Sequence, residues 1–460
     1  MQTTLEYERK LDAPPGFELP DLGGEPIEPR IFTSVYHDTT ERSLARAGIT
    51  LRRRTERGRS VWQLKIPVNG ARMELEEPGG PSAPPEPLRS LLRAHERHGT
   101  VAPVAELRTR RHGALVQREG TSAEVTIDEV SVMDAQRVES AFVEIEVELK
   151  DGKPAMLTRI AKELERAGAR TTDGTPKLFR VLEVQKPAKK PKEPFDALRA
   201  LLREQLDAVL AHDPGTRLGA DPESLHDMRV AVRRSRALLR TGKALVATDT
   251  EPLELELKWI GELLGAVRDL DVLLERLRAE AAALDPADRA ASGRLLRTLD
   301  RQRGRARRAL LKALDSERYS SLLDRYESTL ESLAPASKAV TLDKLAARQF
   351  QRLRQAVKAV GPAPTDEQLH DLRKRGKRTR YAHELAGAKN VIRRAKAFQD
   401  VLGEHQDAAV AEERLRALSR DVPPDQAVVA GLLIAREQVK RAAARAAWPK
   451  AWQALERAAK

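Results

Sequence analysis

The chain has 460 residues, and its 82 lysines and arginines against 69 aspartates and glutamates give a formal net charge of +13. This length predicts two or three domains, and the charge predicts a polyanionic partner such as nucleic acid, an anionic membrane surface or a phosphate polymer. The absence of cysteine excludes disulfides, thiolate zinc sites and cysteine nucleophiles. Only 3% of the residues are aromatic, which disfavours nucleic acid because single strands are bound by stacking on aromatic side chains.

The sequence shows no apolar signal-peptide core at its start and no run of about 18 apolar residues elsewhere. We therefore expect a cytoplasmic protein with no membrane partner. Segments of alternating character dominate residues 1–183 and predict antiparallel strands, followed by a helix at 154–168. The predicted strands cover residues 5–11, 49–56, 60–68, 71–77, 106–112, 123–132 and 141–150.

Charged side chains recur at every second position of these strands, so they share one face of each strand. In a small barrel, alternate residues point inward. An interior lined by so many charged side chains must bind a ligand. Divalent ions such as Mg²⁺ or Mn²⁺ bridge carboxylates to phosphates, and arginine and lysine hold the remaining phosphate oxygens. The pattern therefore predicts metal-assisted phosphoryl chemistry. The residues expected inside are Glu6, Glu8, Lys10, Arg52, Arg54, Lys65, Arg72, Arg108, Arg110, Glu144, Glu146 and Glu148.

The chain changes character at residues 184–194, where prolines and lysines predict an exposed linker. From 195 to 460 the apolar periodicity is helical, and the sequence repeats itself: Gly265 and Asp269 correspond to Gly403 and Asp407. We therefore expect an all-helical bundle of two similar halves, about 195–334 and 340–460. The whole chain is predicted to have an α+β multidomain fold.

Each half of the helical part contains a helix with one basic face. Like charges three or four positions apart repel each other, so such a face needs open solvent or an anion against it. Its duplication, each time beside an apolar stripe, favours an anion in a cationic groove between the two halves. The two stripes are His226, Arg229, Arg233 and Arg236, and His370, Arg373, Lys377 and Arg380.

Three segments resemble the CYTH domain of the triphosphate tunnel metalloenzymes: "EYERK" at 6–10, "YHDTTERSLARAGITLRRR" at 36–54 and "EIEVELK" at 144–150. The resemblance covers roughly residues 1–180. It implies an eight-stranded β-barrel tunnel in which glutamates bind a divalent metal, basic residues hold a triphosphate, and a metal-activated water hydrolyses it. Members of the family include inorganic triphosphatases, thiamine triphosphatases and a class of adenylyl cyclase.

Carried over by position, this resemblance implies roles for individual residues. The implied metal ligands are Glu6, Glu8, Glu144, Glu146 and Glu148, and the choice among the three late glutamates stays open. The implied catalytic residues are Glu6, Glu8, Lys10, Lys65 and Asp128. The implied substrate-binding residues are Arg52, Arg54, Arg72, Arg108, Arg110 and Lys177.

The paired segments "LHDMR" at 225–229 and "LHDLRK" at 369–374 resemble the CHAD domain, an α-helical domain often fused to CYTH. The resemblance implies binding of inorganic polyphosphate along a basic groove. Arg268 of the first repeat corresponds to Gln406 of the second, so we expect the two halves to bind unequally. The implied polyphosphate-binding residues are His226, Arg229, Arg233, Arg236, Lys258, Arg268, His370, Arg373, Lys377, Arg380, Lys396 and His405.

These observations predict a metal-dependent inorganic triphosphatase that acts on tripolyphosphate or a related short phosphate chain. Its helical domain is expected to bind inorganic polyphosphate and to associate with polyphosphate granules. One alternative is a non-catalytic protein that binds polyphosphate or targets it. Another is a thiamine triphosphatase or adenylyl cyclase activity of the barrel.

Overall fold

The computed structural model describes residues 1–68, 71–172, 174, 176–182, 191, 193–337 and 341–459. The chain divides into two compact units, Met1–Ala188 with Leu210–Ser224 and Lys189–Val209 with Leu225–Lys460. Most of the predicted linker at 184–194 lies outside the described residues.

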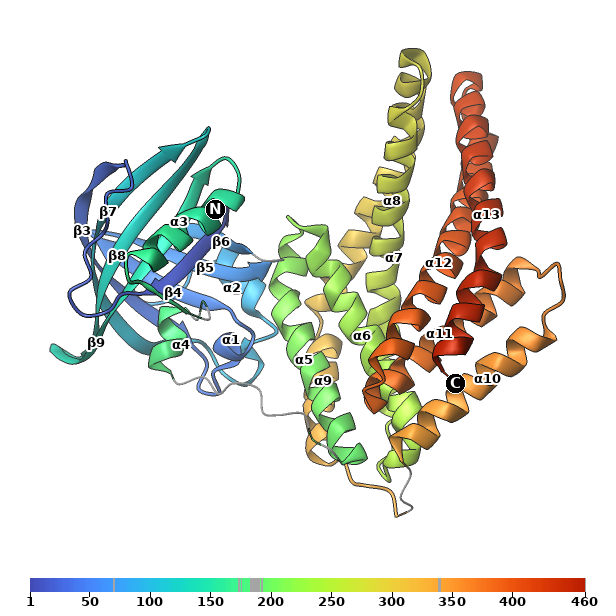
Figure 1. Ribbon diagram of the computed structural model, residues 1–460, viewed down its shortest axis with the longest axis horizontal. Coiled ribbons are helices and arrows are strands. Elements are labelled where there is room, and N and C mark those ends of the chain that lie inside the picture. Colours follow the sequence, from blue (N-terminus) through green and yellow to red (C-terminus); the bar gives the residue numbers. More distant parts are fainter. Residues whose placement is uncertain are drawn as a thin grey trace. The chain divides into compact units, whose positions relative to one another are not determined.

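The first unit is built on one antiparallel sheet of ten strands (Figure 1). The strands are β1 (Gln2–Glu6), β2 (Glu8–Asp12), β3 (Glu25–Asp38), β4 (Thr50–Glu56), β5 (Arg59–Val68), β6 (Ala71–Pro78), β7 (Ala102–Arg118), β8 (Thr121–Asp134), β9 (Arg137–Asp151) and β10 (Arg170–Thr171). Their order in the sheet is β1-β6-β5-β4-β3-β7-β8-β9-β2-β10. Because β1 and β2 are consecutive in the chain yet lie near opposite ends of this order, the sheet curls round and closes into a barrel.

The structure confirms an antiparallel barrel followed by a helical domain, although the sheet has ten strands where eight were expected. The difference arises because one segment is broken at Tyr7, so that β1 pairs with β6 while β2 pairs with β9, and because β10 adds two residues beside β2. Strand β3 was not among the predicted strands. Pro26 and Pro29 obscure its alternation, and proline cannot donate to a sheet ladder.

Short helices accompany the barrel: α1 (Ser43–Arg46), α2 (Glu86–Arg89), α3 (Ala155–Arg166) and α4 (Lys177–Val181), with 3-10 helices η1 (Ser90–Leu92) and η2 (Glu96–His98). Helix α3 covers the outer face of β2 and β9, where Ile145 and Val147 pack against Ile160 and Leu164. The outward apolar face of the acidic strand is therefore buried under a helix, as its alternation predicts.

Helix α4 closes one end of the barrel. Its Leu178 packs in an apolar cluster with Tyr36 of β3, Leu107 of β7 and Val130 of β8. Figure 1 shows α4 at one end of the barrel. Because apolar side chains fill this end, charged ligands have to reach the interior elsewhere.

The remaining helices are α5 (Pro194–Leu218), α6 (Pro222–Gly242), α7 (Glu251–Ala282), α8 (Pro286–Leu314), α9 (Glu317–Glu331), α10 (Leu342–Ala359), α11 (Asp366–Ala386), α12 (Lys389–Leu418) and α13 (Pro424–Ala458), with 3-10 helices η3 (Lys243–Leu245) and η4 (Ser419–Asp421). Within the described residues, every helix is too short or too polar to cross a bilayer.

The end of α5 and the start of α6 belong to the compact unit of the barrel. His95 contacts both the Ser43 hydroxyl (Nδ1–Oγ 2.9 Å) and the Leu210 carbonyl (Nε2–O 3.1 Å). Ala211 and Leu218 pack on the cluster around Trp62. The helical domain was predicted to begin at residue 195, but residues 210–224 belong to the compact unit of the barrel.

The second unit shows the predicted internal duplication. Helices α6, α7 and α8 of the first half correspond to α11, α12 and α13 of the second, and Figure 1 shows α7 with α8 and α12 with α13 as two pairs of long helices. A Cβ on Gly265 would lie 3.6 Å from the Arg229 guanidinium, and one on Gly403 would lie 3.4 Å from that of Arg373. An arginine of the basic helix therefore lies beside the matched glycine in both halves.

The halves share an apolar core formed by α7, α8, α12 and α13, which includes Leu295, Leu415 and Leu433. Arg276 of α7 crosses between the halves, with its Nη2 2.7 Å from Glu404 and 2.6 Å from the fully buried Glu437. Since breaking a buried, hydrogen-bonded ion pair costs about 3–5 kcal/mol, this contact fixes the halves in one arrangement.

We expect Leu415→Ala to lower the free energy of unfolding by about 2–5 kcal/mol, because it opens a cavity in the core shared by the halves. Leu255→Ala is the matched control: this leucine is 57% exposed, so the change should stay within about 0.5 kcal/mol. Urea unfolding followed by circular dichroism measures both. Equal effects would contradict the shared core.

Candidate active site and basic surface

The barrel encloses a cavity of about 170 Å³, here called the central cavity. Nine of its lining residues are lysine or arginine and seven are glutamate. So many buried charges are stable only when they pair with one another or with a ligand. The lining residues are Glu6, Glu8, Lys10, Arg30, Tyr36, Thr50, Arg52, Arg54, Gln63, Lys65, Arg72, Glu74, Glu76, Arg111, Glu124, Glu146, Glu148, Lys150, Pro176 and Lys177.

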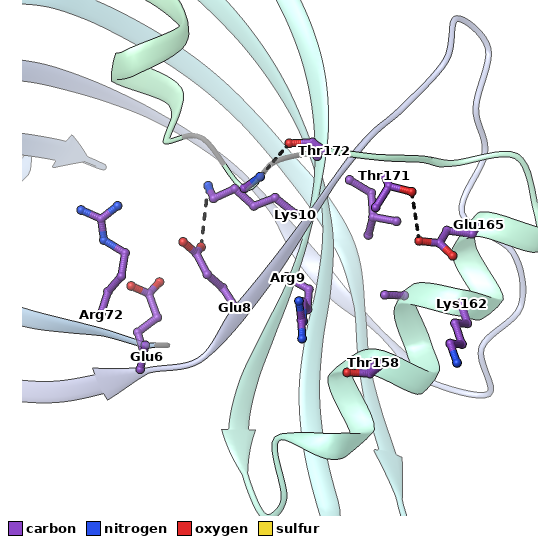
Figure 2. A pocket seen from close by; sticks show the side chains of 14 residues that line it. Glu6, Glu8, Arg9, Lys10, Arg72, Thr158, Lys162, Glu165, Thr171 and Thr172 are labelled. Atoms are coloured by element: carbon purple, nitrogen blue, oxygen red, sulfur yellow. Dashed lines mark hydrogen bonds and ion pairs between the residues drawn. The ribbon is translucent and has the colours of Figure 1, made fainter. Parts of the chain in front are cut away.

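The first strand places its charged residues as the sequence predicts. Glu6 ends β1 and Glu8 begins β2, while the Tyr7 carbonyl between them accepts a hydrogen bond from the Leu149 amide (2.9 Å). The alternation continues through the break, so Glu6, Glu8 and Lys10 all line the central cavity. Figure 2 shows these three side chains on the same side of the strand.

Glu146 lies at the centre of a network of three cations. It accepts hydrogen bonds from Lys10 Nζ (2.5 Å), from Lys177 Nζ (2.8 Å) and from Arg111. Burial opposes ionisation, but these cations hold the pKa of Glu146 well below its ordinary value. Burial likewise disfavours the charged form of Lys10. The neighbouring carboxylates outweigh this effect of burial and raise the pKa of Lys10. The network is therefore fully ionised.

A row of glutamates crosses three neighbouring strands. Glu8 of β2 is paired in register with Glu148 of β9, and Glu148 with Glu124 of β8. Like charges directly opposite each other destabilise a sheet. Burial raises the pKa of Glu148, and the carboxylate of Glu6 adds to this shift, against the pull of Lys150. Glu6, Glu8 and Glu148 all line the central cavity and offer the oxygen ligands that divalent cations prefer, but among the described residues they do not form a group whose oxygens lie within 4.8 Å of one another.

Asp128, predicted to be catalytic, and Glu144, predicted to bind metal, are fully buried and are not among the residues lining the central cavity. Asp128 accepts hydrogen bonds from Arg111 Nε (2.7 Å) and Lys177 Nζ (2.6 Å), and Lys177 Nζ lies 2.7 Å from Glu144. With Glu146 they form a carboxylate cluster within 4.8 Å. Lysine and arginine pair with this cluster, as Lys65 pairs with Glu6, and its three carboxylates are close enough together to hold a metal ion.

The predicted cations Arg52, Arg54, Lys65, Arg72 and Lys177 all line the central cavity. Lys65 Nζ donates to both oxygens of Glu6 (2.7 and 2.6 Å), and Arg52 donates to Gln63 (2.7 Å). Burial lowers the pKa of Arg54 and of Arg72, and Arg52 adds to this through its like charge. An anion in the cavity would therefore stabilise both guanidinium groups.

The prediction that Arg108 and Arg110 line the tunnel is wrong. Both are exposed on the outer face of β7, where Arg110 pairs with Glu129 (3.4 Å). The inner face carries Leu107, Thr109 and Arg111, so the alternation begins one residue away from the position assumed. Arg30, Glu124 and Lys150 were also missed. The cross-strand pairing of Arg111 with Asp128 would have identified the inward arginine, but the register is not visible in the sequence.

In the second unit, the two basic helices face each other, as the duplication predicts. Burial lowers the pKa of Lys377 on α11 to about 7, and the charges of Arg373, Arg233 and Arg229 add to the shift. Arg233 and Arg229 belong to α6. Arg234 of α6 also lies 3.3 Å from Glu384 of α11. We name the group Arg229, Arg233, Arg373, Lys377 and Arg380 the paired basic surface.

The carboxylates of the repeat hold its arginines in place. Arg229 Nη2 lies 3.0 Å from Asp269. Burial lowers the pKa of Arg373, and the matched Asp407 opposes that shift. Gln406, which replaces Arg268 in the second half, hydrogen-bonds His370. The two halves therefore support their basic residues differently at this one position.

Other predicted polyphosphate ligands lie apart from this cluster. Lys258 and Lys396 are exposed, and Lys258 lies 3.8 Å from Glu262 on its own helix. The prediction for His405 is wrong, because its side chain is only 1% exposed and its Nε2 lies 3.3 Å from Asp366. His226, Arg236 and Arg268 are half-buried on α6 and α7.

Two family models match the chain, the CYTH domain over residues 4–179 and the CHAD domain over residues 200–416. The uncharacterized protein Rv2226 of Mycobacterium tuberculosis is 32% identical over 483 residues, which cover 94% of this chain and 93% of that protein. The chain belongs to the CYTH–CHAD family. Members of the CYTH superfamily are metal-dependent triphosphatases or cyclases.

Three solved structures are similar to parts of this CYTH–CHAD protein. PptA from Streptomyces chartreusis is 27% identical, with a TM-score of 0.49, over 56% of this chain and 99% of its own. The CHAD domain from the plant Ricinus communis is 24% identical, with a TM-score of 0.48, over 59% and 94%. A putative adenylyl cyclase from Hippeastrum, described as having a dominant triphosphatase activity, is 16% identical, with a TM-score of 0.27, over 40% and 98%.

Without a bound anion, Lys377→Met should raise the melting temperature by a few degrees at neutral pH, because it removes a buried like charge. The folded chain holds fewer protons at this side chain than the unfolded chain between pH values of about 7 and 10.5, so its contribution to stability increases with pH across that window. The variant should lose this increase. Calorimetry at several pH values measures it, with the exposed Lys374→Met as control, and a lower melting temperature for Lys377→Met would contradict the assignment.

Proposed function

We propose that the barrel domain hydrolyses inorganic tripolyphosphate, or a related short phosphate chain, with Mg²⁺ or Mn²⁺. The observation that carries this proposal is the central cavity, in which nine cationic and seven acidic side chains line one enclosed space. A phosphate chain offers oxygens to cations along its whole length, and a divalent metal joins it to carboxylates. The metal-dependent chemistry of the CYTH superfamily supports the same function.

In this proposal the cations of the cavity hold the phosphate oxygens. Arg52 and Arg54 of β4 present planar guanidinium groups that can each bind two oxygens, whereas Lys65 acts as a point charge. Because these groups are fixed before the reaction, they stabilise the charge that develops on the transferred phosphoryl group without reorganisation.

The carboxylates divide into two groups with different roles. A divalent ion held by Glu6, Glu8 and Glu148 would polarise a phosphate oxygen and supply a water molecule of lowered pKa. Glu146 and Asp128 are positioning residues, because they hold Arg111 and Lys177 by hydrogen bonds of 2.6 to 2.8 Å. Lys177 thereby reaches the cavity although its helix lies at the end of the barrel.

The lining favours an inorganic chain over a nucleotide or a thiamine ester. Among the described lining residues, Tyr36 is the one aromatic side chain, and its hydroxyl accepts a hydrogen bond from Arg52 (3.2 Å). A purine or thiazolium ring would need an apolar or aromatic face to lie against. Tripolyphosphate has no such requirement.

We expect Glu6→Gln and Glu8→Gln each to lower phosphate release from tripolyphosphate by about 10²-fold or more, the usual effect of removing one preorganised electrostatic group. Glu129→Gln is the matched control, since this glutamate is half-buried on the outer face of β8, away from the central cavity, and should leave the rate unchanged. Orthophosphate is measured with Mg²⁺ and with Mn²⁺. No release by the wild type with either metal would favour a tunnel that only binds the chain.

We further propose that the helical domain binds inorganic polyphosphate at the paired basic surface. Burial lowers the pKa of Arg229, Arg373 and Lys377, so an anion lying over them would relieve their repulsion. The Nε atoms of Arg233 and Arg373 are buried and donate no hydrogen bond within the described chain. Association with cytoplasmic polyphosphate granules would follow from such binding.

The double variant Arg233→Ser/Arg373→Ser should weaken binding of long-chain polyphosphate by about tenfold or more, because a hydrogen bond to a charged group contributes about 1.5–3 kcal/mol. Arg301→Ser on α8 serves as the control, since Arg301 is exposed and hydrogen-bonds only along its own helix, to Thr298 (3.0 Å). Fluorescence anisotropy with labelled polyphosphate measures both. Equal losses would indicate binding by net charge alone.

A further inference from the structure

Two neighbouring cavities share lining residues with the central cavity, and each shares a different set. The wider one, of about 1070 Å³, shares Arg30 and Arg54 with the central cavity and extends to Arg57 and Arg59 at the β4–β5 turn. We call it the mouth. The other, of about 380 Å³, is here called the side cavity and shares Glu6, Glu8, Lys10 and Arg72 with the central cavity.

The side cavity passes through the wall of the barrel. It is lined by Lys10 from the inner face of β2, by Arg9 from the outer face, and by Thr158 and Lys162 of α3. In Figure 2, Lys10 with Glu8 lies on one side of the strand, and Arg9 with Thr158 lies on the other. One cavity therefore connects the charged interior with the surface beneath α3.

The opening follows from the way the barrel closes. Before Tyr7 the chain pairs with β6, and after Tyr7 it pairs with β9. The other edge of β2 pairs, within the described residues, only with the two residues of β10. Among the described residues no ladder joins β6 to β10. Within the part of the chain that the structure describes, no strand pairing closes the wall between Arg72 and Thr171, which both line the side cavity.

Charge and packing give the two openings different roles. The mouth does not include Glu6 or Glu8, whereas the side cavity borders both of these candidate metal ligands. The nearby end of the barrel is plugged by α4 and Leu178. A small anion formed beside Glu6 and Glu8 therefore has the side cavity as its short path to solvent, with the exposed cations Arg9 and Lys162 along it.

We propose that the phosphate chain enters through the mouth and that the released orthophosphate leaves through the side cavity. This inference rests on the proposed function. In the hydrolysis, the water oxygen forms a bond to the terminal phosphorus, and the bond from that phosphorus to the bridging oxygen breaks. The electron pair stays on the bridging oxygen of the shortened chain, and the water proton passes to solvent.

The absence of cysteine allows a direct test, because one introduced thiol can be labelled selectively. Thr158→Cys carrying a bulky maleimide should obstruct the side cavity. Single-turnover hydrolysis of tripolyphosphate should then persist, while steady-state turnover falls by about tenfold or more relative to the unlabelled variant, because product release becomes limiting. Labelled Arg59→Cys, at the mouth, should slow both reactions.

Labelled Arg159→Cys is the matched control, since Arg159 is exposed on the same helix and is not among the residues lining the side cavity. Glu165→Cys, also exposed and lining that cavity, repeats the test if Thr158→Cys folds poorly. Unchanged steady-state turnover after labelling Thr158→Cys would overturn the exit path while leaving the hydrolase intact. No single-turnover hydrolysis by the wild type would overturn the proposed function itself.

Discussion

Everything in the barrel depends on burying many ionised side chains in one small space without leaving any of them uncompensated. Each buried ion costs several kcal/mol of lost hydration, which close pairing offsets only when its geometry is good. The Glu146 network meets this condition with Lys10, Lys177 and Arg111. Glu8 and Glu148 oppose each other in register, so Lys150, 2.7 Å from Glu148, has to offset a repulsion as well as a charge. The protein therefore supplies most of the compensation itself, and in the proposed function a metal and a phosphate chain would supply the remainder.

The helical unit applies the same constraint at its surface. An apolar stripe fixes each basic helix in the bundle, with Leu225, Met228 and Val232 buried on the first. Its cations are thereby held near one another, and their like charges add to the lowering of the pKa values of Lys377 and Arg373. Duplication doubles this effect, because the second helix brings its own fixed charges to the same place. The acidic partner Asp269 limits the cost without cancelling the charge.

Much of this arrangement could be predicted from local pattern. Period two located the acidic strands and the inner face of Glu6, Glu8 and Lys10, and the repeated histidine helices indicated facing halves. The errors arose where three-dimensional packing, and not the local sequence pattern, determines which way a side chain points. The run containing Arg108, Arg110 and Arg111 has arginine on both faces, and only its register with β8 shows which one points inward. His405 follows the repeat in sequence, yet packing against Asp366 removes it from the surface.

The strand that is broken at Tyr7 also affects how the barrel folds during synthesis. The segment that closes the barrel, β1 with β2, precedes its partners β6 and β9 in the chain, and these partners end at Pro78 and Asp151. Until those residues have been synthesised, β1 and β2 have no partner strands. Their glutamates remain in water and their backbone groups remain unpaired. Contacts so distant along the chain slow folding, so the barrel acquires its interior only near the end of its own synthesis.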